Sequence, residues 1–494
     1  MSENVTVPEV LSEHEQITIR KKKLENMQSD GNNPFAQKVF EFSHLARDIR
    51  ERFDELEGQT VRLAGRIMSR RDMGKAFFTD LRDTSGRIQL YVKVDDLGEE
   101  SFAAFKKLDI SDFIGIEGFV FKTRRGEISV HCKTVIALSK ALRPLPEKFH
   151  GLKDNDLRYR QRYLDLIMNQ DVLDTFRARS KILNVLRNEL ENRGYVEVET
   201  PVLHTHATNA AARPFRTKHN TLSLDMVLRV ELELYLKRLI IGGFDRVFEI
   251  GRIFRNEGMS VKHNPEFTML EFYQAYTDYL GIAKLCEELY KAIADQVIGS
   301  RIITYQGTEI NLDGEWRRLT MCGAVKQYSG VDFDEIQTDA DAVKIAKEHK
   351  LPVEDDHTRG EIINLFFEHY AEDELIQPTF ICDYPIEISP LAKKTNYDPR
   401  LTERFELFIY GREMGNAFTE LNDPIDQRER FTQQALKKHK EGEFEIDNDF
   451  ITAMEHGMPP TGGMGLGLDR MVMLFTDSAS IRDVLLFPTM RPIE

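Results

Sequence analysis

This 494-residue sequence has few cysteines and no long apolar runs. Its four cysteines, Cys132, Cys286, Cys322 and Cys382, stand far apart, and none forms a C-x-x-C pair. This spacing argues against a zinc site or a disulfide framework and favours reduced, buried thiols. No run of eighteen apolar residues occurs, and residues 1–10 lack a basic start followed by an apolar block. We therefore expect no membrane span and no secretory signal, and the cytoplasm as the compartment.

The composition is that of a folded chain with room for two or three domains, at 41% hydrophobic and 30% charged residues. The net charge of -15 argues against a protein coated in nucleic acid. The charge is unevenly spread, however, because residues 60–140 hold 15 Lys and Arg against 11 Asp and Glu. An anionic partner is thus expected to bind locally.

Short alternating runs of apolar residues fill residues 60–142. Four or five such strands, separated by Gly, Asp and Lys turns and joined by a helix near 101–108, predict a small β-barrel of the oligonucleotide-binding kind. Such a barrel needs stacking rings and hydrogen-bonding tips on one face. Candidates of those types are Arg71, Phe78, Gln89 and Glu127.

A basic helical segment precedes the barrel. Apolar residues recur at helical spacing from about Pro8 to Met27, and the stretch carries the cluster Arg20-Lys-Lys-Lys23. Two interpretations of this cluster stay open, a solvated charged face or contact with a nucleic-acid backbone. We place the helical segment at 1–57, the barrel at 58–143 and a proline-containing linker at 144–160.

The second half of the chain is organised around a predicted hairpin. Two strand-like runs, 246–250 and 267–273, flank a charged loop that contains Arg255 and His263. Because side chains alternate along a strand, Arg255 and Glu257 should share one face, as should Phe267, Met269, Glu271 and Tyr273. An arginine and a histidine can neutralise a polyphosphate, and a phenylalanine ring can stack on a base.

Three stretches in this order resemble the signature motifs of class II aminoacyl-tRNA synthetases. Residues 195–203, predicted as one strand closed by a proline, resemble motif 1, and the hairpin resembles motif 2. Gly465-Leu-Gly-Leu-Asp-Arg470 resembles motif 3. Longer strings, among them His263-Asn-Pro-Glu-Phe-Thr268 and Glu420-Leu-Asn-Asp423, narrow the resemblance to the bacterial-type lysyl-tRNA synthetases of subclass IIb, over residues 33–492.

The resemblance implies an α+β fold. An N-terminal OB-fold barrel would read the tRNA anticodon through the four candidate residues named above. A class II catalytic domain would follow over 161–494, with a mainly antiparallel sheet and a helical insertion at about 335–375. It also implies a homodimer assembled through the motif 1 region, with lysine tRNA and L-lysine as partners and no membrane.

The resemblance further implies a site for ATP and Mg²⁺. In amino-acid activation a carboxylate attacks the α-phosphorus of ATP, so the site must supply cations without supplying a base. Glu406 and Glu413, which we predict on one strand over 404–414, are implied to bind magnesium. The residues implied to bind ATP are Arg255, Glu257, His263, Phe267 and Arg470, and Arg255 with Arg470 form the expected catalytic pair.

A pocket for lysine needs an anion at its end and apolar walls along the four-carbon stem. By resemblance, Glu420 meets the ε-ammonium together with Glu271 and Tyr273. Phe418 is implied to pack against the stem, and Glu233 to hold the α-amine. The full set implied to bind lysine is Asn209, Glu233, Glu271, Tyr273, Asn416, Phe418 and Glu420.

Two positions beside the expected α-amine site depart from the usual family pattern. Thr208-Asn209 stands where the family usually has two glycines, and Glu231 stands where it usually has a small residue. Glu231 and Glu233 repel each other unless a cation or a shared proton lies between them. We therefore expect weakened lysine binding or a preference for a more cationic ligand. Alternatively, Glu231 turns away and pairs with Arg229 or Arg213, which leaves an ordinary pocket.

The expected reaction is activation of L-lysine by ATP and transfer to the 3′ end of lysine tRNA. Two rivals stay open. A diverged paralogue would bind tRNA or another ligand for regulation without aminoacylation, although the intact Arg255, Glu406, Glu413 and Arg470 speak against it. A lysine-to-protein ligase, similar to the enzyme that modifies elongation factor P, would lack the barrel that this chain keeps.

Overall fold

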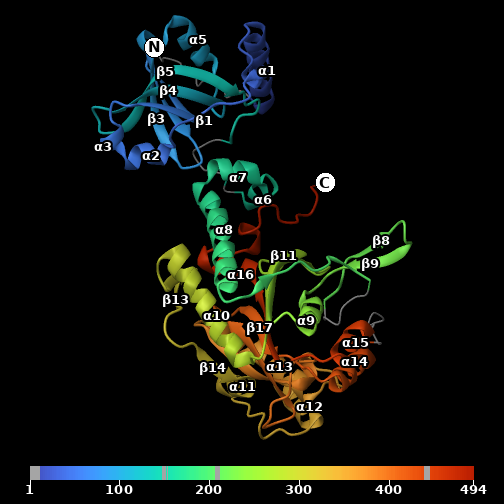
Figure 1. The fold of residues 1–494 in the computed structure, drawn as a ribbon. Helices are drawn as coiled ribbons and strands as arrows, with labels where there is room; N and C mark the ends of the chain where they lie inside the picture. The colour runs from blue at the N-terminus through green and yellow to red at the C-terminus, as the bar shows by residue number, and fades with distance from the viewer. Residues whose placement is uncertain (1–11, 147–151, 153, 206–211, 439–445, 494) are drawn as a thin grey trace, which may run out of the picture. The chain divides into compact units, whose positions relative to one another are not determined.

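The computed structural model describes residues 12–146, 152, 154–205, 212–438 and 446–493. The chain divides into two compact units, Met1–Gly151 and Leu152–Glu494, called here the N-terminal and C-terminal units. The expected α+β fold class, a barrel followed by a larger unit with a mainly antiparallel sheet, is confirmed. Figure 1 colours the barrel blue to cyan and the C-terminal unit green to red.

The N-terminal unit is a closed five-stranded barrel in the order β1-β2-β3-β5-β4. Buried and partly exposed residues alternate along its strands, because one face of each strand packs inward. The inward side chains, such as Leu81, Leu90 and Ile116, form a continuous core. The elements are β1 (Thr60–Asp72), β2 (Ala76–Arg82), β3 (Arg87–Lys93), α4 (Val94–Leu97), α5 (Glu99–Lys107), β4 (Phe113–Lys122) and β5 (Ile128–Ser139).

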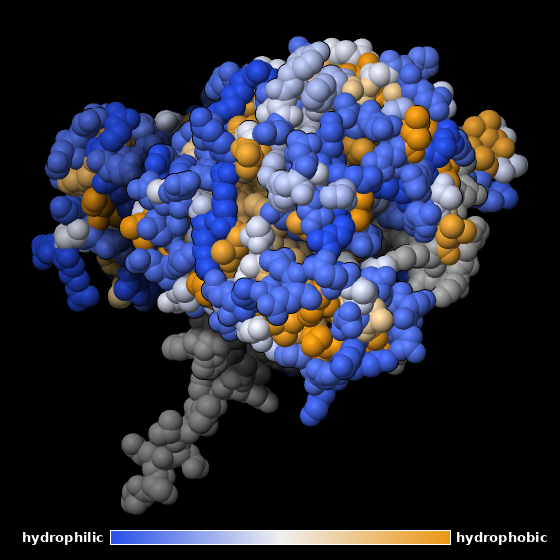
Figure 2. Space-filling view, turned by 90° about the horizontal axis from the view of Figure 1, so that it is seen from below, coloured by the Kyte–Doolittle hydropathy of each residue, from blue (hydrophilic) through white to orange (hydrophobic). Residues whose placement is uncertain are grey.

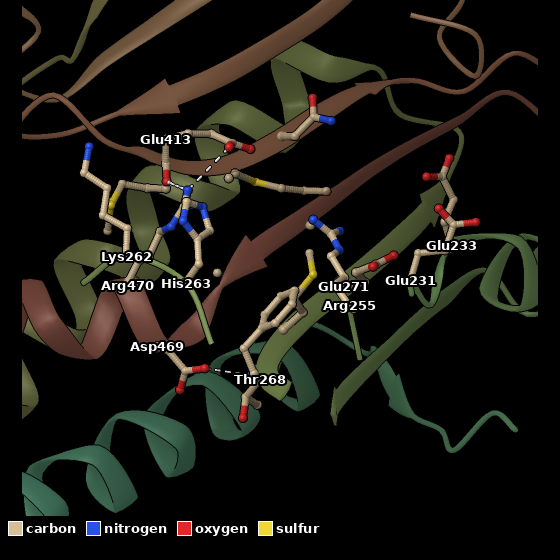
Figure 3. A pocket seen from close by; sticks show the side chains of 18 of the residues that line it. Glu231, Glu233, Arg255, Lys262, His263, Thr268, Glu271, Glu413, Asp469 and Arg470 are labelled. Carbon is tan, nitrogen blue, oxygen red and sulfur yellow. Dashed lines mark hydrogen bonds and ion pairs between the residues drawn. The ribbon is translucent and has the colours of Figure 1, made fainter. Parts of the chain in front are cut away.

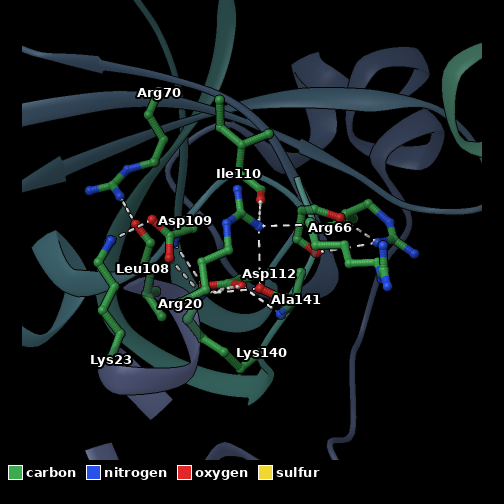
Figure 4. A network of polar contacts seen from close by, with 12 residues as sticks. Arg20, Lys23, Arg66, Arg70, Leu108, Asp109, Ile110, Asp112, Lys140 and Ala141 are labelled. Atoms are coloured by element: carbon green, nitrogen blue, oxygen red, sulfur yellow. Dashed lines mark hydrogen bonds and ion pairs between the residues drawn. The ribbon is translucent and has the colours of Figure 1, made fainter. Parts of the chain in front are cut away.

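Helix α1 (Glu13–Ser29) is joined to the barrel through its basic cluster, as Figure 4 shows. Arg20 is buried, and its guanidinium donates hydrogen bonds to three backbone carbonyls next to the barrel strands. Lys23 pairs with Asp109 at 2.5 Å. Neither expectation for the basic cluster holds for Arg20, because its donors satisfy backbone carbonyls instead of facing water or a nucleic acid. The elements η1 (Pro34–Ala36), α2 (Ala46–Glu51) and α3 (Phe53–Leu56) lead into β1.

The C-terminal unit is built on an eight-stranded sheet in the order β14-β15-β16-β17-β18-β11-β10-β6. Neighbours are antiparallel except for the pairs β14–β15 and β6–β10. The strands are β6 (Val196–Glu197), β10 (Arg246–Phe254), β11 (Glu266–Ala275), β14 (Arg317–Thr320), β15 (Thr379–Pro385), β16 (Leu401–Phe408), β17 (Glu413–Thr419) and β18 (Thr461–Gly467). Smaller sheets join β7 (Leu203–His204), β9 (Leu224–Leu228) and β8 (Arg216–His219), and β12 (Ile302–Tyr305) with β13 (Thr308–Asn311).

Three helices, α8, α10 and α16, pack on one face of the large sheet and leave the other face for a site. Leu270 and Phe272 of β11 belong to the core beneath these helices. Because side chains alternate along a strand, Met269, Glu271 and Tyr273 lie on the opposite face. The helices are α6 (Asn155–Arg160), α7 (Arg162–Met168), α8 (Gln170–Glu191), α9 (Glu233–Ile241), α10 (Tyr279–Ile293), α11 (Met321–Ser329), α12 (Asp339–Glu348), α13 (Arg359–Tyr370), α14 (Pro424–Lys438), α15 (Asn448–Glu455) and α16 (Leu468–Phe475).

The strand predicted over residues 195–203 is broken into the two-residue strands β6 and β7, so that prediction was wrong in extent. Pro201 has no N–H to donate to a ladder. The preceding N–H, of Thr200, instead donates to the carboxylate of Glu249 at 3.0 Å. Helix α6 also begins inside the stretch that we assigned to a linker.

Glu406 and Glu413 do not share one strand, as we predicted, but lie on the adjacent strands β16 and β17. The chain reverses between them at Tyr410 and Gly411, which both have positive φ angles, 57° and 60°. A glycine adopts this conformation without steric cost, so the turn forms there. The two carboxylates are therefore brought together by strand pairing rather than by spacing along one strand.

Among the described residues, no helix is long and apolar enough to cross a membrane. Hydrophilic residues cover most of the face in Figure 2, and hydrophobic residues gather there only in small patches. This distribution is ordinary for the surface of a folded domain.

Candidate active site

A cavity of about 360 Å³ opens on the face of the large sheet that α8, α10 and α16 leave free. Strands β11, β17 and β18 and the loop after β10 line it. Figure 3 shows Lys262, His263 and Arg470 toward one end, together with Glu413, and it shows Glu231, Glu233 and Glu271 toward the other end, with Arg255 beside Glu271. The predicted site residues that line this cavity are Glu233, Arg255, Glu257, His263, Phe267, Glu271, Tyr273, Glu413, Asn416, Phe418 and Arg470.

Arg255 and Arg470 line the cavity from different elements. Arg255 follows β10, and its N–H donates to the Pro265 carbonyl at 2.8 Å, which fixes the start of the loop. Its guanidinium carbon lies 5.2 Å from the centre of the Phe267 ring. Arg470, in the first turn of α16, donates to the backbone carbonyl of Glu413 at 2.5 Å. Two guanidinium groups can thus face one polyanion from two sides.

His263 lies beside Arg470, with 3.4 Å between His263 Nε2 and the nearest guanidinium nitrogen. Its other ring nitrogen is 2.9 Å from the Ser260 hydroxyl. Burial, followed by the charge of Arg470, lowers the pKa of His263. The ring is therefore neutral at pH 7 until an anion arrives, and it can gain a proton when a phosphate group lies next to it.

A buried aspartate ties the start of α16 to the hairpin. One oxygen of Asp469 accepts the Thr268 N–H at 2.7 Å, and the other pairs with Arg179 of α8 at 2.6 Å. Arg179 also donates to the Thr268 hydroxyl at 3.1 Å. This network holds α16, and with it Arg470, against β11.

Glu406 and Glu413 face a second cavity of about 430 Å³, which shares Lys262, His263 and Arg470 with the first. The Glu406 carboxylate accepts from the Tyr384 hydroxyl at 2.8 Å and pairs with Arg404 at 2.5 Å. Burial raises the pKa of Glu406 to about 7, although Arg404 opposes the shift. Paired carboxylate oxygens next to a phosphate-sized basic space fit magnesium, which takes one or two carboxylates and completes its shell with phosphates and water. Among the described residues, no group of three or more His, Cys, Asp or Glu side chains could hold a metal ion.

Three glutamates, Glu231, Glu233 and Glu271, line the opposite end of the first cavity. Glu271 is buried, and its carboxylate accepts from the Leu232 N–H at 3.2 Å and the Tyr273 hydroxyl at 3.1 Å. Burial first, and then the charges of Glu233 and Glu231, raise the pKa of Glu271 to about 8. At pH 7 this carboxyl therefore keeps its proton until a cation enters.

Glu420 lies just beyond β17, fully buried at this acidic end. Its Oε2 pairs with the ammonium of Lys237, which also pairs with Glu233 Oε1 at 2.6 Å. Glu420 Oε1 accepts no hydrogen bond from the described part of the chain. That oxygen lies 2.3 Å from where a Cβ on Gly463 would be, so only a glycine lets it reach the cavity wall. Glu420 thus lies behind Gly463, a residue of the cavity wall, and its buried Oε1 has no donor among the described residues.

Phe418 and Asn416 lie on β17 between the two ends of the cavity. The Phe418 ring is mostly buried and offers an apolar wall. The side-chain oxygen of Asn416 accepts from Arg404 at 3.0 Å, which leaves the amide nitrogen as the group able to donate to a ligand.

Glu231 lines the cavity, and its charge is one of the causes that raise the pKa of Glu271. Arg229, one of the two arginines considered as its partner, pairs with Glu249 at 2.6 Å and donates to two carbonyls. Asn209 and Thr208, the other departures near the α-amine position, lie outside the described residues.

The barrel carries its candidate residues near an aromatic cluster. Phe78 lies 5.0 Å from Tyr91 between ring centres, and the Arg71 guanidinium is 5.9 Å from the Phe78 ring. Gln89 is largely buried, and its oxygen accepts from the Ser129 hydroxyl at 3.1 Å, while Glu127 is exposed on the loop before β5. The sequence interpretation missed the rest of this cluster, Tyr91, Phe119, Phe121 and His131, whose rings follow one another at 4.7 to 6.2 Å.

Sequence reasoning also missed Lys237, Asp469 and Arg179. A signal for Lys237 was present, because it stands four residues after Glu233 and so shares its face of a helix. Asp469 precedes Arg470 inside the motif 3 string, but its partners come from distant parts of the chain. No spacing along the sequence could have paired it with Arg179.

The fold and the site agree with the families that match this sequence. Residues 154–491 match the family described as tRNA synthetases class II (D, K and N), and residues 61–138 match the OB-fold nucleic acid binding domain. The chain therefore belongs to the class II tRNA synthetases, with an OB-fold domain in front.

Within that class, the similar proteins are lysine–tRNA ligases. The chain is 55% identical to that of Thermoanaerobacter pseudethanolicus, over 97% of this chain and 96% of the relative. It is 55% identical to that of Clostridium acetobutylicum, over 96% and 93%, and 54% identical to that of Moorella thermoacetica, over 98% and 99%. The chain belongs to the lysine–tRNA ligase family, and the resemblance seen in its motifs is confirmed.

Proposed function

We propose that this protein activates L-lysine with ATP and transfers the lysyl group to the 3′ end of lysine tRNA. The observation that carries the choice of lysine is the buried Glu420 Oε1, which lies behind Gly463 at the acidic end of the cavity and finds no donor in the described part of the chain. An amino acid with a second ammonium group satisfies that oxygen. Aspartate would instead bring another carboxylate to Glu233 and Glu271, and asparagine would bring no charge.

The proposed activation step needs positioned cations rather than a base. The lysine carboxylate is already the nucleophile, and one of its oxygens attacks the α-phosphorus while pyrophosphate leaves. Arg255 would stabilise the charge on the α-phosphate and the attacking carboxylate, and Asn416 would orient that carboxylate through its amide nitrogen. Arg470 and His263 would hold the outer phosphates, and Phe267 would stack on the adenine.

Glu406 and Glu413 would hold the magnesium ion of the ATP complex. When bound, magnesium supplies charge neutralisation between the phosphates. Arg404 and Tyr384 fix the Glu406 carboxylate, so this ligand is positioned before the nucleotide binds.

The barrel would read the anticodon of lysine tRNA. Phe78 is partly exposed next to Tyr91, which gives a base a surface to stack on, and Arg71 lies within reach of the same ring. The excess of basic residues over 60–140 supports local contact with an anionic backbone.

A homodimer assembled through the motif 1 region is part of the proposal. Val196 on the edge strand β6 is 46% exposed, and Leu203 on β7 is 44% exposed. An apolar sheet edge of this kind favours a second copy of the chain. The cytoplasm, where tRNA is charged, is the proposed compartment.

Amino-acid-dependent exchange of pyrophosphate into ATP tests this function directly. Lysine should support exchange, and aspartate and asparagine should not. Glu420→Gln should raise the lysine KM by about 10- to 150-fold, since a hydrogen bond to a charged group is worth about 1.5–3 kcal/mol. Glu309→Gln, which changes an exposed glutamate on β13, is the matched control. A normal lysine KM in Glu420→Gln would contradict the assignment.

A further inference from the structure

One ammonium group of the protein itself lies between two carboxylates of the acidic end. Lys237 Nζ contacts Glu233 Oε1 at 2.6 Å and Glu420 Oε2, and it lies 5.2 Å from the centre of the Phe418 ring. All three of these residues belong to the proposed lysine pocket. Lys237 itself has no place yet in the proposed reaction.

Lys237 cannot leave this position. Its side chain is fully buried, and it shares a face of α9 with Glu233, one helical turn away. Removing a buried ammonium from its carboxylates leaves uncompensated charges, which is strongly unfavourable. The contacts are therefore a fixed part of the pocket rather than a passing surface pair.

A single nitrogen that contacts two carboxylates also fixes how far apart they are. Charge-assisted contacts of about 2.7–2.9 Å keep the two oxygens within roughly 5–6 Å of each other. In the proposed function, Glu233 reads the α-amine of the substrate and Glu420 reads its ε-ammonium. The distance between the groups that read the two ends of lysine is thus set by a residue that touches neither end.

We propose that Lys237 is a positioning residue that sets the spacing between Glu233 and Glu420 and so selects amino acids with the four-carbon stem of lysine. This inference rests on the proposed function. Ornithine, one methylene shorter, cannot satisfy both carboxylates at the fixed spacing. A missing methylene in a fitted pocket costs about 10- to 200-fold in kcat/KM.

Lys237→Met removes the cation and keeps much of the side-chain volume. We expect the lysine KM to rise at least tenfold and the preference for lysine over ornithine to fall at least fivefold, with the ATP KM within twofold of the original. Lys140→Met is the matched control, because Lys140 is equally buried between Asp109 and Asp112 in the N-terminal unit. It should lower stability without changing the lysine KM.

The pH dependence separates positioning from structural damage. Glu420 faces Lys237, Glu233, Glu271 and Tyr273, and without the cation it keeps a proton to higher pH. The ratio of the lysine KM of Lys237→Met to that of the original enzyme should therefore shrink as pH rises from 7 to 9. A damaged pocket would show a constant ratio.

If Lys237→Met keeps the lysine KM and the preference for lysine over ornithine of the original enzyme, the inference is overturned and the proposed function still stands. If the original enzyme shows no lysine-dependent exchange, the proposed function fails, and the inference fails with it. If Lys237→Met does not fold, Lys237→Arg decides. Its forked guanidinium cannot keep the single-nitrogen spacing, so the lysine to ornithine preference should change at least fivefold, and an unchanged preference would refute the role.

Discussion

Glu271 should make the stability of this protein fall as pH rises from about 5 to 8. In the folded chain it keeps its proton to about pH 8, because it is buried and faces the charges of Glu233 and Glu231. In the unfolded chain the pKa of a glutamate is about 4.3. Between these values the folded state binds one proton more than the unfolded state, so the free energy of unfolding decreases with rising pH.

The magnitude follows from the same interval. Each pH unit is worth about 1.4 kcal/mol for one proton, so the full interval amounts to on the order of 5 kcal/mol. Glu271→Gln keeps the shape and removes the titration. The variant should lose this component, and its unfolding temperature should fall less than that of the original enzyme between pH 5.5 and 8.

The assay is thermal unfolding at matched ionic strength across this pH range, without ligands. The difference in unfolding temperature between the two proteins should grow steadily with pH. Lysine should also bind more tightly as pH rises toward 8, because its ammonium group favours the ionised Glu271. Parallel curves for Glu271→Gln and the original enzyme would refute the reasoning.

Three further predictions separate the parts of the site. Phe78→Ala should weaken tRNA binding by about 1–3 kcal/mol and so slow tRNA charging, while pyrophosphate exchange stays normal. Phe42→Ala, which changes an exposed phenylalanine, is the control. Equal losses in both assays would refute the assignment of tRNA binding to the barrel. Arg470→Ala and Glu413→Ala should each lower exchange by about 10²- to 10³-fold with an unchanged circular dichroism spectrum, and a normal rate would remove either residue from the reaction. Glu231→Ala should lower the lysine KM and leave the ATP KM unchanged, because it removes a charge that keeps Glu271 protonated; an unchanged or higher lysine KM would show that this glutamate is harmless.

The helices and strands that the sequence predicted correctly are those marked by a repeating pattern of neighbouring residues. The run Phe77 to Leu81 alternates with period two, and β2 extends it by one residue at each end. The face shared by Phe267, Met269, Glu271 and Tyr273 follows from the same alternation, and all four line the cavity. The family motifs are short strings in a fixed order, and they predicted the residues at the basic end of the cavity.

The features that sequence did not predict depend on contacts between distant segments. Lys237 on α9 pairs with Glu420, which stands 183 residues later in the chain. Arg20 was interpreted as a surface cation. Its three carbonyl partners lie 90 to 123 residues away in the chain, so the sequence around Arg20 gave no sign of them. Glu406 and Glu413 were predicted on one strand. A tyrosine does not indicate a positive φ, so the turn at Tyr410 could not be seen in the sequence.

The central claim is that the acidic end of the cavity recognises the ε-ammonium of lysine, and one measurement tests it most directly. Pyrophosphate exchange into ATP is measured with lysine, ornithine, aspartate, asparagine and norleucine, which has the lysine stem without its ammonium. The account predicts exchange with lysine, far less with ornithine, and none with the other three. Exchange with norleucine equal to that with lysine would contradict it, because Glu420 Oε1, which has no donor among the described residues, would then play no part in recognition.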